Sequence, residues 1–336
     1  MSKISIKNLK NSIGKEAQIN GWVYNIRSIG KIWFVIVRDG TGYVQCVVTK
    51  NDVSDKVFEL ENLLTQESSL KIKGTVQADT RSDSGVEILV SDIDIVHIAD
   101  EYPISLKEHG VSFLMDNRHL WLRSKKQFAI MKIRQQLIRS IRNFFDDRDF
   151  VLLDSPIFTA NAVEGTTTLF ETDYFNRSAY LSQSGQLYQE AGAIAFGKTY
   201  CFGPVFRAEK SKTRKHLTEF WMVEPEMAYC DINQNMDIIE EFMSNVIKDA
   251  LDNCADELKI LERDISKLEN ISAPFPRISY DEAVDILTKK GHEFEYGSDF
   301  GAPDEEVLAS QFDKPVMVHS WPHETKAFYM KRDKSD

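Results

Sequence analysis

Apolar and polar residues alternate over much of the first hundred positions of the chain, as they do in β-strands with one buried face. Five such runs are separated by Gly, Asp and Ser, and a helix-like run, 52–64, lies between the third and the fourth. The five runs are 17–28, 31–40, 42–50, 68–78 and 85–99. Short strands with turn residues between them predict a small all-β barrel that carries one helix.

In the second part of the chain, apolar residues recur every three or four positions, which is typical of amphipathic helices. One stripe consists of Ile130, Ile133, Leu137, Ile141 and Phe144, and another of Ile238, Ile239, Phe242, Val246 and Leu251. After a proline-rich turn, Ser279 or Asp281 is expected to cap a short helix. We predict an α+β chain with a five-stranded OB-fold barrel at 1–100, a linker and domain entry at 101–120, and a second domain at 121–336.

Composition narrows the class of protein only a little. The net charge of −11, from 41 basic and 52 acidic residues, argues against non-specific nucleic-acid binding but leaves selective RNA recognition open. No apolar run is long enough for a transmembrane helix, and the N-terminus lacks the features of a signal peptide, so we expect a cytoplasmic protein. The four cysteines are scattered, which predicts neither disulfides nor structural zinc.

The segment 202–229, FGPVFRAEKSKTRKHLTEFWMVEPEMAY, carries the strongest functional signal. Two strand-like runs flank a polar loop with four cations between Arg207 and His216, which is typical either of a solvated hairpin or of a site for an anion. The order Phe-Arg-x-Glu, a variable loop, His and Phe resembles motif 2 of the class II aminoacyl-tRNA synthetases, in their aspartyl/asparaginyl branch. This resemblance implies that ATP and Mg²⁺ are used to activate an amino acid.

The resemblance assigns a role to each residue of the hairpin. Arg207 would bridge the amino-acid carboxylate and the α-phosphate, as the catalytic residue, unless it is a surface Arg paired with Glu209. Glu209 would hold the adenine amino group or orient Arg207, and Phe220 would stack on adenine unless it is a core residue. His216, assisted by Arg214, would contact the γ-phosphate. The residues expected to touch the tRNA acceptor end are Lys210, Ser211 and Lys212.

Two further segments resemble the amino-acid pocket of the same branch. In AYLSQSGQLYQEAG, Ser184 and Gln186 correspond to residues that hold the substrate's α-amino group, although Ser184 also suits a helix cap. In NAVEGTTTLF, Glu164 lies on what resembles a mobile loop and would meet the α-ammonium group. The first apolar stripe, a strand-like run 151–153 and Pro156 resemble motif 1, which implies a homodimer.

The same segment separates asparagine from aspartate. Aspartyl enzymes commonly have Pro and Lys where this chain has Gly185 and Gln189, and the lysine pairs with the substrate's side-chain carboxylate. A pocket without that cation favours a neutral amide. Glu224 or Glu226 would accept a hydrogen bond from the amide NH₂, and we favour Glu224. The resemblance thus implies ligation of asparagine to its tRNA through asparaginyl-adenylate, with aspartate as the alternative substrate.

The barrel resembles the anticodon-binding domain of this branch, which presents an Arg, an aromatic residue and a Gln on one face. Arg27, Phe34 and Gln45 follow that order, with one residue fewer between the first two. Phe34 would stack on an anticodon base, and Gln45 would read the central uridine. Trp33 competes with Phe34 for the outward position.

The resemblance breaks at the end of the chain. Motif 3, a Gly-rich run followed by an Arg that holds the γ-phosphate, does not occur before Asp336. We therefore expect an incomplete class II catalytic domain, a metal site beyond Asp336, and no asparagine activation by the 336 residues alone. A non-catalytic tRNA-binding paralogue remains an alternative, and a relative of the asparagine synthetases is disfavoured because those lack the barrel.

Overall fold

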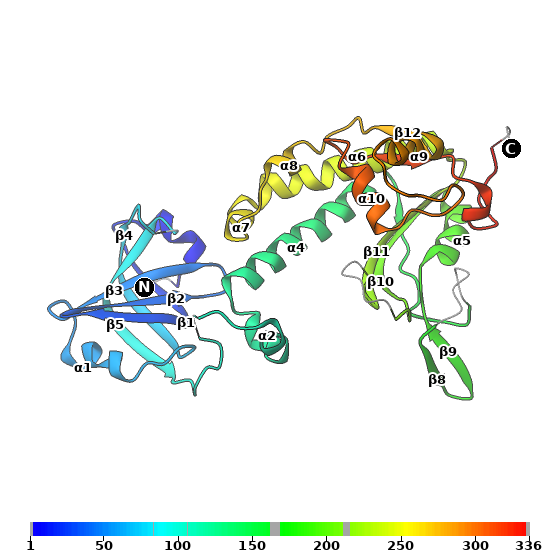
Figure 1. Ribbon diagram of the computed structural model, residues 1–336. Helices are drawn as coiled ribbons and strands as arrows, with labels where there is room; N and C mark the ends of the chain where they lie inside the picture. The colour runs from blue at the N-terminus through cyan, green and yellow to red at the C-terminus, as the bar shows by residue number, and fades with distance from the viewer. Residues whose placement is uncertain (1–2, 83, 106, 162–168, 211–215, 334–336) are drawn as a thin grey trace. The chain divides into compact units, whose positions relative to one another are not determined.

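The computed structural model describes residues 3–82, 84–105, 107–161, 169–210 and 216–333. Contacts divide the chain into two compact units, Met1–Trp121 and Leu122–Asp336. Figure 1 shows both units with their elements labelled. Among the described residues, no helix combines the length and the apolar character that crossing a bilayer requires.

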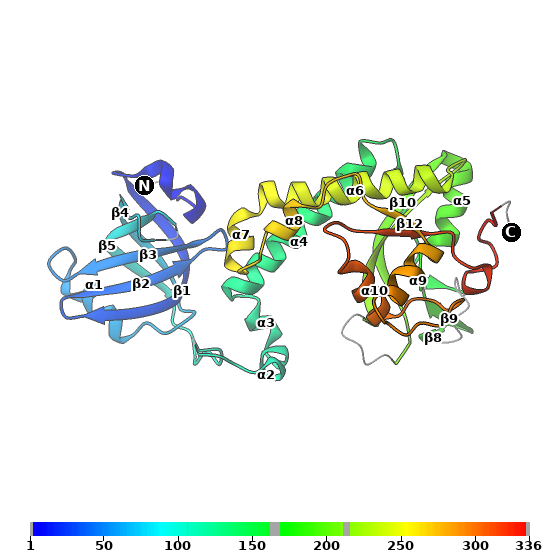
Figure 2. The same cartoon turned by 45° about the horizontal axis from the view of Figure 1, so that its top comes forward.

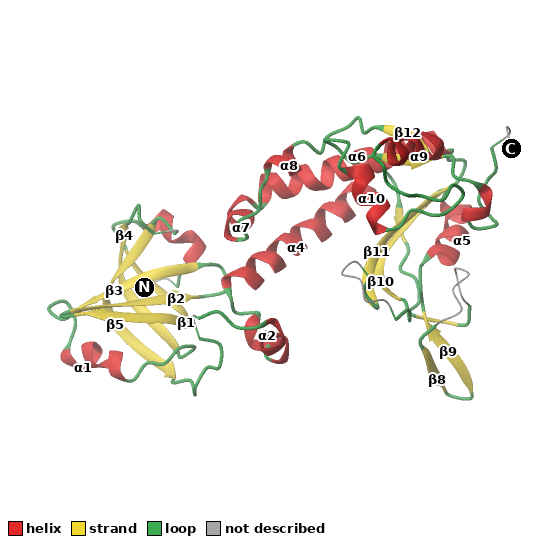
Figure 3. Cartoon of the chain, viewed as in Figure 1, coloured by secondary structure: helices red, strands yellow, loops and turns green. Residues whose placement is uncertain are grey.

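The first unit is a closed barrel in which the strands follow the order β1-β2-β3-β5-β4. The strands are β1 (Glu16–Ile29), β2 (Ile32–Arg38), β3 (Tyr43–Thr49), β4 (Ser69–Ala78) and β5 (Val86–His97). The short helices of the unit are η1 (Ile6–Ser12), α1 (Asp55–Phe58), η2 (Glu59–Asn62), α2 (Val111–Asp116) and α3 (Arg118–Trp121). The predicted barrel is confirmed, and α1 lies between β3 and β4 as expected (Figure 3).

Strict alternation of buried and half-buried residues in β2 and β3 builds the barrel core. Trp33, Val35 and Val37 are fully buried, and Cys46 and Val48 meet them from the neighbouring strand. Period-two alternation places every second side chain inside the barrel. The outer face of β2 and β3 therefore carries the residues between them, which are half-buried.

The second unit is built around a three-stranded sheet of order β11-β10-β6. The elements of its main layer are α4 (Lys125–Asp146), β6 (Val151–Leu152), α5 (Gln186–Phe196), β10 (Lys198–Phe206), β11 (Glu219–Met227) and α6 (Ile232–Asn253). Helices α4 and α6 run side by side (Figure 2) and pack parts of the two predicted apolar stripes against Tyr200 and Phe202. In the α6 stripe, Ile238, Phe242 and Val246 take part, whereas Ile239 is 41% exposed. The stripe of α4 is buried only in its second half, since Ile130 is 41% exposed.

The remaining elements of the second unit are short. They are β7 (Phe158–Thr159), β8 (Glu171–Tyr174), β9 (Arg177–Leu181), α7 (Ala255–Ile260), α8 (Ser266–Glu269), β12 (Arg277–Ser279), α9 (Tyr280–Lys289), α10 (Ala302–Ala309), β13 (Met317–His319) and η3 (His323–Thr325). Ser279, one of the two predicted caps, begins α9: its hydroxyl accepts from the N–H of Glu282, whose carboxylate accepts from the N–H of Ser279. A small core around Leu287 and Leu308 holds α9 and α10 together.

Candidate active site and RNA-binding face

The hairpin of β10 and β11 has two unlike faces. Its antiparallel register pairs Cys201 with Glu224 and Val205 with Phe220. Tyr200 and Phe202 belong to the core beneath α4 and α6. Because successive side chains of a strand point to opposite sides, Cys201, Glu224 and Phe220 lie on the other face. This second face is the candidate active site.

Arg207 and Phe220 lie together at the loop end of this face. The Arg207 guanidinium carbon is 5.7 Å from the centroid of the Phe220 ring, and both residues are half-buried. The Arg207 N–H donates to the carbonyl of Thr218 at 3.0 Å, which closes the hairpin. A half-buried ring beside a guanidinium provides a surface for a base and a fork for a phosphate, so this part of the site suits ATP.

Three other predicted residues of the hairpin lie at the two ends of its loop. Glu209, Lys210 and His216 are exposed. Ser211, Lys212 and Arg214 lie outside the described residues, as does Glu164 of the second loop.

Glu224 is held by donors from a different segment. The Gly185 N–H donates to its two carboxylate oxygens at 3.0 and 3.1 Å, and the Ser184 hydroxyl donates to Oε1. The Cys201 thiol donates to Oε2 at 3.5 Å. Burial raises the pKa of this thiol to about 12, with a further contribution from the charge of Glu224, so the thiol keeps its proton. The carboxylate is thus fixed from several sides.

Helix α5 begins at Gln186, two residues after Ser184, which contacts Glu224. Ser184 is 3% exposed, and its hydroxyl accepts from the N–H of Gln186 at 3.0 Å. The Gln186 amide donates to Glu190 at 2.9 Å and accepts from the Tyr329 hydroxyl at 3.4 Å. The Ser184 hydroxyl thus joins the first residue of α5 to Glu224. The N-cap of α5 is Gly185, so the helix cap suggested for Ser184 is not formed, and its contact with the substrate's α-amino group stays a prediction.

Gln189 occupies the position of the aspartyl-branch lysine, and it is fully buried. Its amide nitrogen donates to the carbonyl of Leu153 at 2.5 Å and to the Ser155 hydroxyl at 3.3 Å. Its backbone carbonyl accepts from Thr199 at 3.1 Å. The position therefore contributes a neutral amide that is engaged with the backbone, and it brings no cation to the pocket.

Glu226 lies on the same sheet face as Glu224, two positions along β11. Burial raises the pKa of Glu226 above its ordinary value, and the neighbouring carboxylates of Glu190 and Glu224 raise it further. No group of three His, Cys, Asp or Glu side chains within the described ranges is arranged to hold a metal ion.

The three predicted residues of the barrel meet on its outer face. Arg27 pairs with Phe34 in the strand register, and its guanidinium carbon is 4.8 Å from the Phe34 ring centroid. The same guanidinium donates to Gln45 at 2.9 Å, and the Gln45 amide donates to Glu87 at 3.2 Å. Trp33 is fully buried, so Phe34 has the outward position. We call Arg27, Phe34 and Gln45 the barrel triad.

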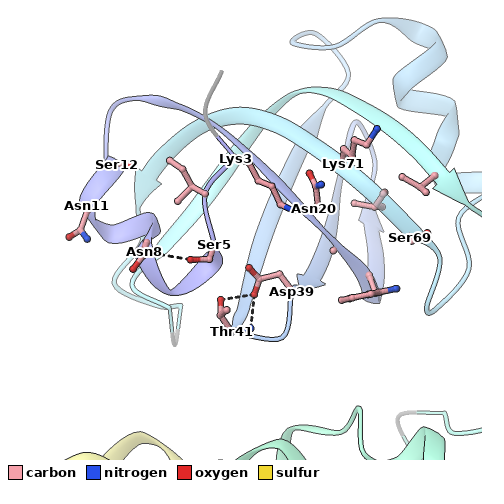
Figure 4. A pocket seen from close by; sticks show the side chains of 15 residues that line it. Lys3, Ser5, Asn8, Asn11, Ser12, Asn20, Asp39, Thr41, Ser69 and Lys71 are labelled. Atoms are coloured by element: carbon pink, nitrogen blue, oxygen red, sulfur yellow. Dashed lines mark hydrogen bonds between the residues drawn. The ribbon is translucent and has the colours of Figure 1, made fainter.

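A hollow of about 1150 Å³ lies elsewhere on the barrel, among η1, β1 and β4 (Figure 4). Trp22, Asp39 and Lys71 are among the residues that line it, and none of the triad does. The Asp39 carboxylate is already hydrogen-bonded within the barrel, because it accepts from Thr41 and from the N–H of Ile6. The hollow is therefore separate from the triad.

Sequence reasoning did not identify four of the contacts that build these sites. The Gly185 N–H and Cys201 hold Glu224, Tyr329 contacts Gln186, and Glu87 contacts Gln45. The alternation along β10 indicates which face carries Cys201. The other three depend on segments that are distant in the chain.

Comparisons with known proteins give the family of the chain. Residues 110–336 match the family described as tRNA synthetases class II (D, K and N), and residues 17–96 match the OB-fold nucleic acid binding domain. The asparagine–tRNA ligases of Pelotomaculum thermopropionicum and Desulforamulus reducens are each 54% identical to the chain, over 99% and 98% of it and 77% of their own length.

A solved structure is similar over the whole chain. Asparaginyl-tRNA synthetase from Pyrococcus horikoshii, complexed with asparaginyl-adenylate, is 41% identical, with a TM-score of 0.94 over 100% of this chain and 78% of that one. The chain therefore belongs to the class II tRNA synthetases. Within that class it belongs to the asparaginyl-tRNA synthetases, the family of its 54% identical relatives.

Proposed function

We propose that the chain ligates asparagine to tRNA through asparaginyl-adenylate formed from ATP. The observation that carries this proposal is the shared face of β10 and β11. There a fixed acceptor, Glu224, lies on the same side of the sheet as Arg207 and Phe220. The family of the chain supports the same reaction.

The positive charge of Arg207 explains how the first step, the formation of asparaginyl-adenylate, would be promoted. A carboxylate oxygen of asparagine attacks the α-phosphorus of ATP, a P–O bond forms, and pyrophosphate leaves. Negative charge develops on the phosphate oxygens, and the planar guanidinium of Arg207 is suited to bind two of them at once. Phe220 would hold the adenine ring by stacking. The terminal ribose hydroxyl of tRNA then attacks the carbonyl carbon, and AMP leaves.

The choice of asparagine follows from the donors and acceptors around Glu224. A carboxylate offers only acceptors, so it attracts the NH₂ of a carboxamide and repels a second carboxylate. Gln189, buried and neutral, supplies no charge to compensate that repulsion. Ser184 and Gln186 would bind the α-amino group, and Glu164 would assist.

For tRNA we propose two contact regions. The barrel triad would bind the anticodon, with Phe34 stacking on a base and Gln45 reading the central uridine. Lys210, with Ser211 and Lys212, would touch the acceptor end, while Glu209, Arg214 and His216 would serve ATP as the family implies. We propose the same division of the chain as before: an anticodon-binding barrel at 1–100, a linker and domain entry at 101–120, and a catalytic domain at 121–336.

Several expectations stay predictions. They are the homodimer and the cytoplasmic location. Mg²⁺ is expected with ATP. Among the described residues, no group of three or more His, Cys, Asp or Glu side chains is arranged to hold it.

Binding tests the proposed specificity without requiring turnover. The probes are the sulfamoyl analogues of asparaginyl- and aspartyl-adenylate, which keep the amino-acid side chain and the adenosine. We expect the asparaginyl analogue to bind about a hundredfold more tightly in calorimetry, as a site built around a hydrogen bond to the substrate requires. Equal binding of the two analogues would exclude an asparagine-specific pocket, and a preference for the aspartyl analogue would establish the alternative substrate.

A further inference from the structure

The peptide of Gly185 occupies a special position between helix α5 and Glu224. Its N–H lies 3.1 Å from Oε1 and 3.0 Å from Oε2 of the carboxylate, so one donor serves both oxygens. On the other side, the Ser155 hydroxyl donates to the Gly185 carbonyl at 3.4 Å and accepts from Gln189 at 3.3 Å. The backbone of Gly185 is thus held at its carbonyl and donates from its nitrogen.

A side chain at this position has no room. A Cβ on Gly185 would lie 2.5 Å from the Cys201 Sγ, 2.6 Å from the Ser155 Oγ and 3.3 Å from the Glu224 Oε2. The backbone itself is ordinary, with φ at −84° and ψ at −3°. Close approach, rather than an unusual conformation, is what requires glycine here. All three of these neighbours are side-chain atoms.

We propose that Gly185 is a specificity-determining residue, whose peptide N–H fixes the Glu224 carboxylate as the acceptor for the substrate's carboxamide. This inference rests on the proposed function and adds a positioning residue to it. A backbone donor cannot rotate away, unlike the hydroxyl of Ser184, which also bonds to Glu224. The N–H therefore orients the remaining lone pairs of both Glu224 oxygens toward the substrate. Because it is itself a donor, it favours an acceptor, such as a carboxylate, in the position of the Glu224 side chain.

Two substitutions at one position separate the donor from the space. Gly185→Ala and Gly185→Pro both add a Cβ where Cys201 and Ser155 stand, but only proline removes the N–H. The observed φ of −84° is negative, as proline requires, but lies just outside its usual range of about −65 ± 15°, and the ring Cδ would take the place of the N–H hydrogen. Each variant is made in the full chain and also in a Cys201→Ala background, which removes the atom nearest to the new Cβ.

The readout is the ratio of dissociation constants for the aspartyl and asparaginyl sulfamoyl analogues, with ATP binding and thermal unfolding as checks on the fold. If Gly185 had only a structural role, its substitution would weaken the binding of both analogues by the same factor and leave the ratio of dissociation constants unchanged. In the Cys201→Ala background, we expect Gly185→Pro to lower the ratio about ten- to a hundredfold, as the loss of a hydrogen bond to a charged group predicts, and Gly185→Ala to keep it within about threefold.

Each other outcome overturns the inference. Equal ratios in the two variants would show that space, and not the N–H, matters. A wild-type ratio in Gly185→Pro that still binds ATP would show that the N–H has no role, while the proposed function would stand. A wild-type chain without preference would defeat the proposed function first and this inference with it.

Discussion

The barrel triad and the Glu224 site solve two recognition problems in different ways. The triad consists of side chains from adjacent strands that contact one another through Arg27, which donates a hydrogen bond to Gln45. Arg27 is also exposed. In the Glu224 site, a peptide N–H from a segment 39 positions away holds the recognition group. The difference suits the ligands, because stacking on a base tolerates adjustment, whereas separating an amide from a carboxylate requires an acceptor that cannot move or rotate.

The largest effect is expected at Glu224. Glu224→Gln replaces one acceptor oxygen with an NH₂ group that faces the substrate amide or the donors of Ser184 and Gly185. We expect the preference for the asparaginyl analogue to fall about a hundredfold or more, measured by calorimetry with both sulfamoyl analogues. Glu226→Gln, on the same sheet face, is the matched control. Equal losses in the two variants would contradict the assignment.

Arg207 offers the next largest effect. Arg207→Lys keeps the charge but loses the planar fork, so ATP binding should weaken about tenfold while folding is retained. The control is Arg177→Lys on β9, another arginine beside an aromatic ring, with its guanidinium carbon 5.5 Å from the Tyr174 centroid. Fluorescence titration with an ATP analogue measures both variants. Unchanged ATP affinity in Arg207→Lys would remove the residue from the phosphate site.

A third variant tests the barrel triad. Phe34→Ala removes the ring that Arg27 covers, and we expect binding of an anticodon stem-loop RNA to weaken about tenfold, in line with the loss of one stacked base. Trp22→Ala removes an exposed aromatic residue of the same barrel that lines the separate hollow. The two variants are compared by fluorescence anisotropy. An RNA affinity that responds only to Trp22 would move the RNA-binding face to the hollow.

The smallest effect concerns pH. The folded chain holds the proton of Glu226 more tightly than the unfolded chain does, where the carboxyl has its ordinary pKa of 4.5. Ionising Glu226 therefore costs stability above its raised pKa, and the cost is absent below pH 4.5. Glu226→Gln should melt at a slightly higher temperature than wild type at pH 7, and the gain should vanish on acidification. A gain that grows toward acid pH in calorimetric scans would contradict the shift.

Much of this arrangement could be predicted from local pattern. Strand alternation with turn residues predicted the barrel, and the order of Arg27, Phe34 and Gln45 predicted a cluster that the strand register brings together. The phase of β2 was harder, because its run is apolar at nearly every position. The sequence pattern then does not distinguish the buried face of β2 from its exposed face. Only the closed barrel shows that Trp33 points inward and Phe34 outward.

The surroundings of Glu224 could not be predicted in the same way. Glycine at 185 carries no local signal for its role, since its backbone conformation is one that any residue adopts. The reason for it lies in Cys201 and Ser155, which reach the same point from β10 and from the segment after β6. Contacts of this kind arise from tertiary packing of loops, and periodicity in the sequence does not encode them.

A crystal structure of the chain with the sulfamoyl analogue of asparaginyl-adenylate tests the central claim most directly. The account predicts the carboxamide nitrogen within about 2.7–3.2 Å of a Glu224 oxygen, with the Gly185 N–H still bonded to that carboxylate and adenine against Phe220. A carboxamide bound elsewhere, with Glu224 facing only Ser184 and Gly185, would contradict it.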